Sequence, residues 1–331
     1  MSSIKILDCT LRDGGYINNW HFGKENIKSI INNLVLSGCE YIECGIIKDC
    51  EYNIDKTLFS DFRQLEKFIP KNSKSQFVLL VNYGDVNVEK IDFENKNIII
   101  KVTFKKFQVK EALEYSKILI EKGYKVFINP MNTISYSSDE LIDLITVVNK
   151  IKPIALSIVD TNGEMTLKDT SRLYSLINKK LNKKIIICFH SHNNLQLSFA
   201  NAQILMGQNT NRTIIIDSTV LGMGRGAGNL CTELLVKYIN DNYNGNYELI
   251  PILKIIDEQI KKIFSVSPWG YSAPYCISAL MHCHPNYAKY LIDKKGVTIE
   301  QIAEILNRIP YEERAIYDIN SIEKYAIKFN L

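Results

Sequence analysis

The stretch "IKILDCTLRDGGYINNWHFGKENIKSIINNLVLSGCEYIECGII", residues 4–47, contains two apolar runs separated by an amphipathic segment. The runs at residues 4–11 and 41–47 have the length and the Ile, Leu and Cys content of buried strands. Between them, residues 24–38 place apolar side chains at three- and four-residue spacing, which is typical of one face of a helix. The stretch therefore predicts a strand, a helix and a second strand, the repeating unit of α/β folds.

This alternation continues through most of the chain. Residues 56–69 form the next amphipathic segment. Six further strand candidates follow it, at residues 76–83, 97–104, 125–132, 153–163, 184–194 and 213–224. Their continuous Ile, Val and Leu character indicates burial on both faces, as in a parallel sheet. Eight such units in roughly 240 residues fit a closed (β/α)8 barrel better than the alternative, an open doubly wound sheet.

The chain beyond the eighth unit has a different character. Residues 240–251 are rich in Asn and Gly and indicate a linker, and the sequence from about residue 248 is predicted to be wholly helical. We therefore expect an α/β fold, with a (β/α)8 barrel domain at residues 1–242 and a C-terminal helical region at residues 248–331.

Composition narrows the class of protein. Of the 331 residues, 46% are hydrophobic, which is enough for a large core, and the net charge of +4 is not gathered in basic runs. A nucleic-acid partner is therefore not expected. The first residues are too polar for a signal peptide, and no apolar run approaches the roughly 20 residues that span a membrane. We expect a cytoplasmic protein with no membrane partner, whose eight cysteines, none in a C-x-x-C pair, stay reduced.

Polar motifs gather at the carboxyl ends of the predicted strands. The motif "DCTLRDGG" ends the first strand, and Glu43 lies within the second. Strands six to eight end in, or lead to, "VDTNG" at residues 159–163, "HSHNN" at 190–194 and "GMGRGAGN" at 222–229. Barrel enzymes build their active sites at this end of the strands, so these motifs are the candidates for the site.

His190 and His192 have the spacing of two ligands on one strand, because residues i and i+2 of a strand face the same way. Asp13 can supply a third ligand, since the first and eighth strands are neighbours in a closed barrel. Two histidines and one carboxylate describe a catalytic metal site with open positions. The alternative is a pair of hydrogen-bonded histidines at a strand end.

A second histidine pair, His282 and His284, invites a different interpretation. It lies in a stretch that is predicted to be a helix ending at Pro285, where residues i and i+2 diverge by about 200°. The two side chains could not bind one ion from a regular helix. His284 alone could reach the barrel mouth if the end of the helix leans over it.

Arg12 lies beside Asp13, where a fixed cation could stabilise an oxyanion or bind a carboxylate. A buried guanidinium needs a partner, and Glu43 on the adjacent strand can supply it; the alternative is an ion pair at the surface. The glycine-rich loop at residues 222–229 follows the last strand and so is not placed as a dinucleotide fingerprint. Its backbone N–H groups could still hold a carboxylate or a phosphate.

Lys101 offers a rival chemistry. It lies in the apolar run "IIIKVTF" and could form a Schiff base with a carbonyl substrate, as in metal-independent aldolases. The alternative is a cation at the strand end or in the barrel lumen. Asp160 and Asn162, after the sixth strand, could support the metal ligands or could simply form a turn.

Taken together, "TLRDG", Glu43, "HSHNN" and "GMGRGAGN" resemble the DRE-TIM metallolyase superfamily, the HMGL-like TIM barrels, in the right order along the whole barrel. This superfamily includes hydroxymethylglutaryl-CoA lyase, isopropylmalate and homocitrate synthases, and 4-hydroxy-2-oxovalerate aldolase. The resemblance implies that Asp13, His190 and His192 bind a divalent metal, Mn2+ or Mg2+. It also implies that Arg12 stabilises an enolate and is braced by the glutamate of the second strand. In the lyase branch an asparagine of the glycine-rich loop approaches the metal, which makes Asn229 a further candidate ligand.

The sequence looks most like the aldolase branch of this superfamily. That branch has a proton-transferring tyrosine in a G-Y-x-x-x-Y run, and Tyr275 in "GYSAPY" matches it. The branch also carries a histidine base two residues after the glycine of R-D-G, and here Tyr16 occupies that position. Tyr16 itself, or His21 five residues further on, is the candidate for the missing base.

The resemblance implies a divalent-metal-dependent aldolase or lyase that cleaves or forms a C–C bond of a 4-hydroxy-2-oxo acid through a pyruvate-type enolate. The alternatives are a Claisen-type synthase that joins an acyl-CoA to a 2-oxo acid, an HMG-CoA lyase-like enzyme, and a noncatalytic barrel with an idle metal site. The expected partners are a small-molecule 2-oxo acid, an aldehyde and further copies of the chain in a homo-oligomer. The aldolase branch adds an aldehyde dehydrogenase as a possible partner.

Overall fold

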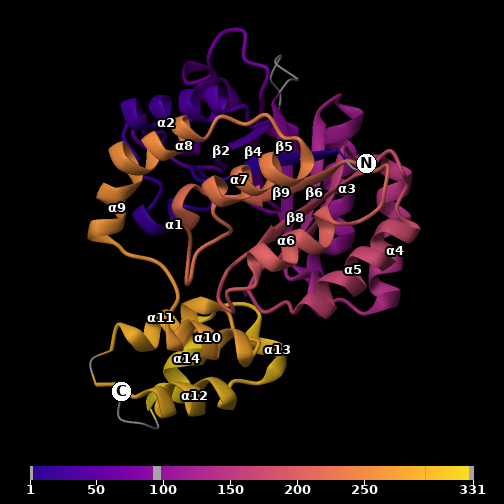
Figure 1. The fold of residues 1–331 in the computed structure, drawn as a ribbon. Coiled ribbons are helices and arrows are strands. Elements are labelled where there is room, and N and C mark those ends of the chain that lie inside the picture. The colour runs from indigo at the N-terminus through magenta and orange to yellow at the C-terminus, as the bar shows by residue number, and fades with distance from the viewer. Residues whose placement is uncertain (1–2, 92–97, 295, 328–331) are drawn as a thin grey trace.

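A computed structural model describes residues 3–91, 98–294 and 296–327, and in it eight parallel strands close into a barrel surrounded by helices (Figure 1). The barrel strands are β1 (Ile4–Asp8), β2 (Tyr41–Ile47), β4 (Gln76–Asn82), β5 (Ile99–Phe104), β6 (Lys125–Pro130), β7 (Ala155–Asp160), β8 (Ile186–Ser191) and β9 (Ile214–Ser218). Each pairs with its neighbours in this order, and pairing of β1 with both β2 and β9 closes the ring. The (β/α)8 barrel expected from the sequence is confirmed.

Helices cover the outside of this barrel, except for the short first helix, which lies at its mouth. They are α1 (Gly15–Asn18), α2 (Lys24–Ser37), α3 (Val109–Glu121), α4 (Ser138–Ile151), α5 (Leu167–Lys180), α6 (Ser198–Met206), α7 (Thr232–Tyr243), α8 (Leu249–Ile255), a π-helical turn (Ile256–Ile260) and α9 (Lys261–Val266). The C-terminal helices are α10 (Ala273–Leu280), α11 (Pro285–Ile292), α12 (Ile299–Arg308), α13 (Tyr311–Arg314) and α14 (Ile319–Ala326). None of the helices among the described residues combines the length and the apolar character that crossing a bilayer requires.

One predicted helix is wrong. The segment at residues 56–69 instead forms a short strand, β3 (Leu58–Phe59), paired to the end of β2, and a 3-10 helix at Phe62–Lys67. The Asp61 side chain accepts a hydrogen bond from the Arg63 N–H and starts the 3-10 helix. Burial of Phe59 at the edge of the barrel outweighs the helical periodicity that the sequence shows there.

The barrel lumen changes character along its axis. Its amino-terminal half is filled by a buried apolar cluster that includes Tyr41, Ile99, Cys188 and Ile215. Two residues further along the same strands, and so on the same face, lie four buried polar side chains: Glu43, Lys101, His190 and Asp217. The lumen-facing positions of these strands are therefore apolar in the amino-terminal half and polar at the carboxyl ends.

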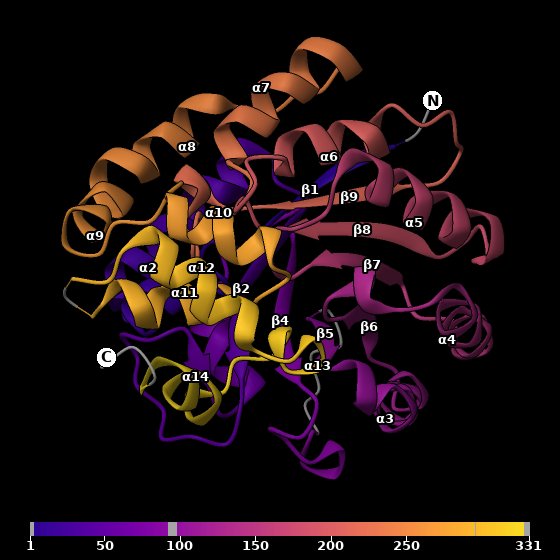
Figure 2. The same cartoon turned by 90° about the horizontal axis from the view of Figure 1, so that it is seen from below.

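The C-terminal helices form a second hydrophobic core over the barrel mouth. Cys283, Tyr287, Leu291, Ile305 and Ile322 are among the residues of this core. In Figures 1 and 2, helices α10–α14 lie together across one end of the barrel. Contacts of this unit with the loops that follow β7 and β9 identify that end as the carboxyl end of the strands.

Helices α8 and α9 belong to the barrel rather than to this second core. Ile252 and Ile255 of α8 are fully buried in the main core, and α8 packs against α2. We therefore propose that the separate C-terminal unit begins after Trp269, beyond the division between residues 242 and 248 that composition indicates.

Candidate metal centre

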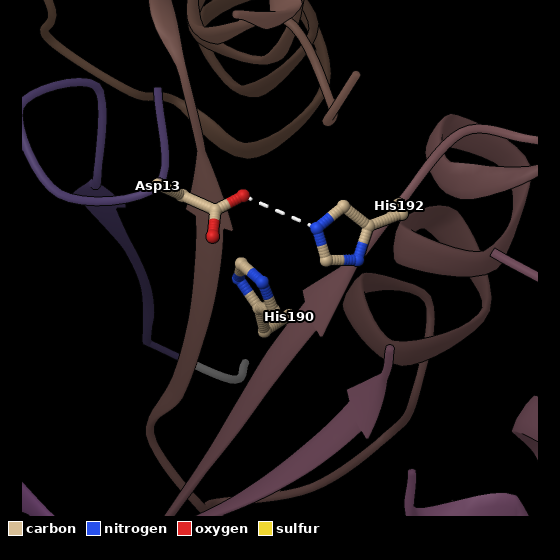
Figure 3. A group of neighbouring side chains, drawn as sticks. All are labelled: Asp13, His190 and His192. Atoms are coloured by element: carbon tan, nitrogen blue, oxygen red, sulfur yellow. Dashed lines mark hydrogen bonds and ion pairs between the residues drawn. The ribbon is translucent and has the colours of Figure 1, made fainter. Parts of the chain in front are cut away.

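Asp13, His190 and His192 come together at the carboxyl end of the barrel (Figure 3). His190 is on β8, His192 lies just beyond its end, and Asp13 lies in the loop after β1. One potential ligand atom from each residue lies within 4.8 Å of the other two, and all three side chains are buried. The His192 Nε2 atom is 3.2 Å from Asp13 Oδ2. The spacing of the two histidines and the closure of the barrel thus bring the sequence-predicted ligands into one cluster.

Hydrogen bonds orient both imidazole rings. The His192 Nδ1 atom lies 3.1 Å from the backbone oxygen of Asp160, and because a carbonyl oxygen only accepts, Nδ1 donates this hydrogen bond and Nε2 points toward Asp13. The His190 Nδ1 atom lies 3.2 Å from Asp217 Oδ2. Partners of this kind fix the tautomer and direction of metal-binding histidines.

The electrostatic surroundings favour the protonation states that a metal needs. Burial lowers the pKa of His190 below its ordinary value, despite the contact with Asp217. Burial alone would raise the pKa of Asp13, but the charge of Arg12 and the contact with His192 outweigh it and hold that pKa well below its usual range. A neutral imidazole and a carboxylate are the forms that bind metal ions.

Asn229 packs against the candidate ligand Asp13. Its Nδ2 atom donates to Asp13 Oδ2 at 2.7 Å and to the Met223 oxygen at 3.0 Å, while its Oδ1 atom is buried without a hydrogen-bond partner among the described residues. A Cβ atom at Gly224 would lie 2.2 Å from Asn229 Nδ2 and 3.4 Å from Asp13 Oδ2. The glycine-rich loop therefore lets the carboxamide pack against the aspartate. Two imidazoles and a carboxylate form a donor set that can hold a divalent cation.

Arg12 is buried beside this cluster and is held by two carboxylates. Its Nε atom donates to Glu43 Oε1 at 2.7 Å, and Nη1 pairs with Asp13. Burial alone would lower the pKa of Arg12, but the charges of Glu43 and Asp13 raise it, so the guanidinium stays charged. A small cavity at the carboxyl end of the barrel, here called the mouth cavity, is lined by Arg12 together with Asp13, His190 and His192.

Lys101 is a fully buried cation inside the lumen. Its Nζ atom donates to Glu43 Oε2 at 3.0 Å and to Asp217 Oδ2 at 2.6 Å. Burial alone would lower the pKa of Lys101, but the charges of Asp217 and Glu43 raise it above its ordinary value. A Schiff-base lysine must be neutral to attack a carbonyl, so this environment opposes the rival chemistry and favours the lumen cation.

Asp217 is the member of the site that the sequence reasoning missed. It accepts from Lys101 and contacts His190, and it thereby connects the chain of ion pairs that begins at Arg12. The sequence singles out Asp217 only because it is a charged residue that interrupts the apolar run "IIIDS" near the end of a strand. A charged residue in a doubly buried strand requires a partner, and that requirement could have identified it.

The three candidates for proton transfer lie at different depths. Tyr16, on α1, lines the mouth cavity, and it also lines a larger outer cavity between the barrel and the C-terminal helices. Tyr275, on α10, lines only the outer cavity, and burial raises its pKa above the ordinary value. His21 is exposed, pairs with Lys56 in a β-bridge, and does not line either cavity.

The prediction of one helix through His282 and His284 is wrong. Helix α10 ends at Leu280, His282 has a left-handed backbone with φ of 59°, and Pro285 begins α11 rather than ending a helix. Proline is favoured in the first turn of a helix, which explains the break. His282 pairs with Glu164, whereas His284 is buried and accepts from the Asn286 N–H at 3.1 Å. The two side chains therefore have separate partners.

Asp160 and Asn162 both stabilise the loop after β7. The Asp160 carboxylate accepts the Glu164 and Met165 N–H groups at 2.9 and 3.0 Å, and Asn162 Nδ2 donates to Glu164 Oε1 at 3.1 Å. Asp160 also supports a candidate ligand through its backbone oxygen, which contacts His192. The two side chains are thus turn formers, and the ligand support comes from the backbone.

Comparisons with known proteins agree with this geometry. A family model described as HMGL-like matches residues 3–257, which include the barrel and the three clustered residues. The 4-hydroxy-2-oxovalerate aldolase of Bacillus cereus is 22% identical over 311 residues, covering 90% of this chain and 89% of that protein. The homocitrate synthase of Pyrococcus horikoshii is 26% identical over 271 residues, covering 79% of this chain and 72% of that protein. A solved N-terminal domain from Bacteroides vulgatus has the same fold, with a TM-score of 0.76 at 24% identity, covering 91% of this chain and 99% of that domain.

Proposed function

Because the chain belongs to the HMGL-like family, we propose that it is a divalent-metal-dependent aldolase or lyase acting on a 4-hydroxy-2-oxo acid. It would cleave or form the bond between C3 and C4 through a pyruvate-type enolate. The observation that carries the proposal is the cluster of Asp13, His190 and His192 with the charged Arg12 beside it. The substrates are then a small 2-oxo acid and an aldehyde.

Asp13, His190 and His192, with Asn229 nearby, would hold Mn2+ or Mg2+. When bound, such a cation supplies Lewis-acid polarisation of a carbonyl group. Arg12 offsets the negative charge that develops on the enolate oxygen, and Glu43 keeps the guanidinium in place.

A tyrosine hydroxyl is the proposed proton carrier for the C4 hydroxyl group of the substrate. Tyr16 lines the same cavity as Arg12 and His192, so its Oη atom is the first candidate. Tyr275 could act from the outer cavity, whereas His21 would need a rearrangement of its loop to take part. Proton transfer requires approach to hydrogen-bond distance, which favours Tyr16 over the other two.

The second candidate is a Claisen-type synthase that joins an acyl-CoA to a 2-oxo acid. The homocitrate synthase relative supports it, because that protein matches most of this chain at an identity similar to that of the aldolase. In a synthase the 2-oxo acid is the electrophile, and the thioester is the partner that loses a proton.

Deuterium exchange separates the two candidates. Pyruvate or 2-oxobutyrate incubated with the Mn2+-loaded protein in D2O should lose its C3 proton signal in NMR, since enolisation is half of a reversible aldol reaction. A synthase should instead exchange the methyl hydrogens of acetyl-CoA. Exchange of acetyl-CoA alone, with several short 2-oxo acids inert, would overturn the aldolase proposal.

A further inference from the structure

Arg225, in the glycine-rich loop, carries a charge that no carboxylate among the described residues pairs with. Its guanidinium carbon lies 3.9 Å from the centroid of the Tyr16 ring, so the cation packs on the face of the aromatic ring. Its Nε atom is buried and has no hydrogen-bond partner among the described residues. Arg225 is in none of the ion pairs that the described residues form. Arg12, by contrast, is compensated by both Glu43 and Asp13.

Arg225 lies where two cavities meet. It lines the mouth cavity together with Arg12 and His192, and it lines the outer cavity together with Trp269 and Tyr275. Only Tyr16 shares this double position among the residues that line the two cavities. A substrate that extends from the metal cluster toward the C-terminal helices would therefore pass Arg225 beyond its reacting carbon atoms.

The other charges of the outer cavity cancel. Lys289 pairs with Asp293 at 2.9 Å, and both line this cavity. His284, next to the cavity-lining Pro285, is kept neutral, because burial and then the charge of Arg225 lower its pKa well below the ordinary value. Arg225 is thus the cation left to give the junction of the two cavities a positive charge.

We propose that Arg225 binds a carboxylate or phosphate group at the far end of the aldehyde portion of the substrate. The inference rests on the proposed function, in which the 2-oxo acid end is bound at the metal cluster and Arg12. A guanidinium binds either anion through paired hydrogen bonds, and stacking on Tyr16 holds its plane before the substrate arrives. The enzyme would then select anionic aldehydes over neutral aldehydes of the same length.

Two pairs of aldehydes test this selectivity, with pyruvate as the common partner. One pair is succinic semialdehyde and butanal, and the other is glyceraldehyde 3-phosphate and glyceraldehyde, so the pairs distinguish a carboxylate from a phosphate. The ratio of kcat/KM for the anionic to the neutral aldehyde should be about tenfold or more in at least one pair. In Arg225→Ala that ratio should fall toward one, and in Arg225→Lys it should be intermediate because the charge remains without the planar fork.

Arg172→Ala is the matched control, since it removes an exposed arginine from α5 and should leave the ratio unchanged. A wild-type protein with no anionic preference in either pair, or an Arg225→Ala variant that keeps the preference, would overturn the inference.

A binding measurement separates this inference from the proposed function. Succinate and glycerol 3-phosphate cannot undergo the aldol reaction, and at least one of them should bind the metal-free wild type about tenfold more tightly than metal-free Arg225→Ala in calorimetry. If pyruvate fails to exchange while the binding of either anion depends on Arg225, the proposed reaction is wrong and the anion site stands. If pyruvate exchanges while both anions bind the two proteins equally, the anion site is wrong and the reaction stands.

Discussion

His192 is held at both of its ring nitrogens, one by the backbone of Asp160 and the other by Asp13. His190 is held at Nδ1 by Asp217. Both rings are therefore oriented by the protein itself. A ligand set that is oriented in advance loses less conformational entropy when it binds a cation.

Asp13→Asn, His190→Ala and His192→Ala should each lower the affinity for Mn2+ by about tenfold or more, because the first removes the charge of one candidate ligand and the other two each remove a donor. Isothermal titration with Mn2+ would measure the change. His282→Ala is the control, since His282 pairs with Glu164 outside the cluster and its loss should leave Mn2+ affinity unchanged. Wild-type affinity in all three cluster variants would show that the metal binds elsewhere.

Arg12→Lys should slow pyruvate exchange by about a hundredfold or more, equivalent to about 3 kcal/mol of transition-state stabilisation. Lysine keeps the charge but cannot contact Glu43 and an enolate oxygen with one planar group. Exchange rates at saturating Mn2+ would measure the loss. A rate close to that of the wild type would restrict Arg12 to a structural role.

Asp8 gives the free energy of unfolding a predictable pH dependence. Burial raises its pKa to about 6, against the hydrogen bond from the Thr232 hydroxyl. The folded state therefore holds the proton more tightly than the unfolded state, and this contribution to stability is lost as pH rises from about 4 to about 6. Asp8→Asn cannot lose that proton, so its stability relative to the wild type should increase by about 2–3 kcal/mol over this range.

Urea unfolding at a series of pH values would measure this trend. Asp139→Asn, at an exposed position of α4, controls for the change in net charge. A stability difference between Asp8→Asn and the wild type that stays constant from pH 4 to pH 7 would contradict the assignment.

At the scale of the elements, strand alternation places the charged residues and barrel closure connects them. Lys101 on β5 reaches Asp217 on β9, and these two strands lie opposite each other in the eight-membered ring. The same lysine reaches Glu43 on β2, which holds Arg12. Lys101 thus links Glu43, which holds Arg12, to Asp217, which holds His190.

Lys101→Met should lower the free energy of unfolding by about 3–5 kcal/mol, because it leaves two buried carboxylates without their shared cation. Combining it with Asp217→Asn should cost less than the sum of the single changes. Denaturant unfolding measures both, with Lys150→Met at the surface of α4 as the control. If borohydride traps a covalent pyruvate adduct on Lys101 in the wild type, the structural role would be contradicted and the Schiff-base chemistry restored.

At the scale of the whole molecule, two hydrophobic cores meet at the site. The barrel core includes α8 and Trp269, whereas helices α10–α14 have a core of their own. The outer cavity lies between the two and is lined by residues from both. The C-terminal unit therefore contributes directly to the space in which a substrate would lie.

Ile305→Ala should destabilise the C-terminal unit by about 2–5 kcal/mol, because Ile305 is fully buried in the second core. Hydrogen exchange would then show faster exchange in α10–α14, with the strands of the barrel unchanged. Ile216→Ala, in the barrel core, is the reciprocal variant and should accelerate exchange in the strands. Equal acceleration throughout the chain in Ile305→Ala would show one cooperative unit instead of two.

The sequence by itself determined the barrel and the spacing of the candidate ligands. Buried strands have continuous apolar runs, and H-x-H on a strand directs both side chains to one face, so local periodicity was sufficient for these features. Local periodicity was insufficient at residues 56–69, where a short strand with the buried Phe59 forms instead of the expected helix. It was also insufficient at Pro285, which begins a helix instead of ending one.

Only the tertiary structure decided which charges meet. Lys101 and Asp217 are 116 positions apart, and Arg225, which follows β9, meets Tyr16, which follows the neighbouring strand β1. Lys101 could be considered as a nucleophile because its two carboxylate partners, Glu43 and Asp217, lie on other strands and cannot be recognised in the sequence. Asp217 was missed for the same reason. Ion pairs and cavities depend on distances between residues remote in sequence, and those distances are set by closure of the barrel and by packing of the C-terminal unit over its mouth.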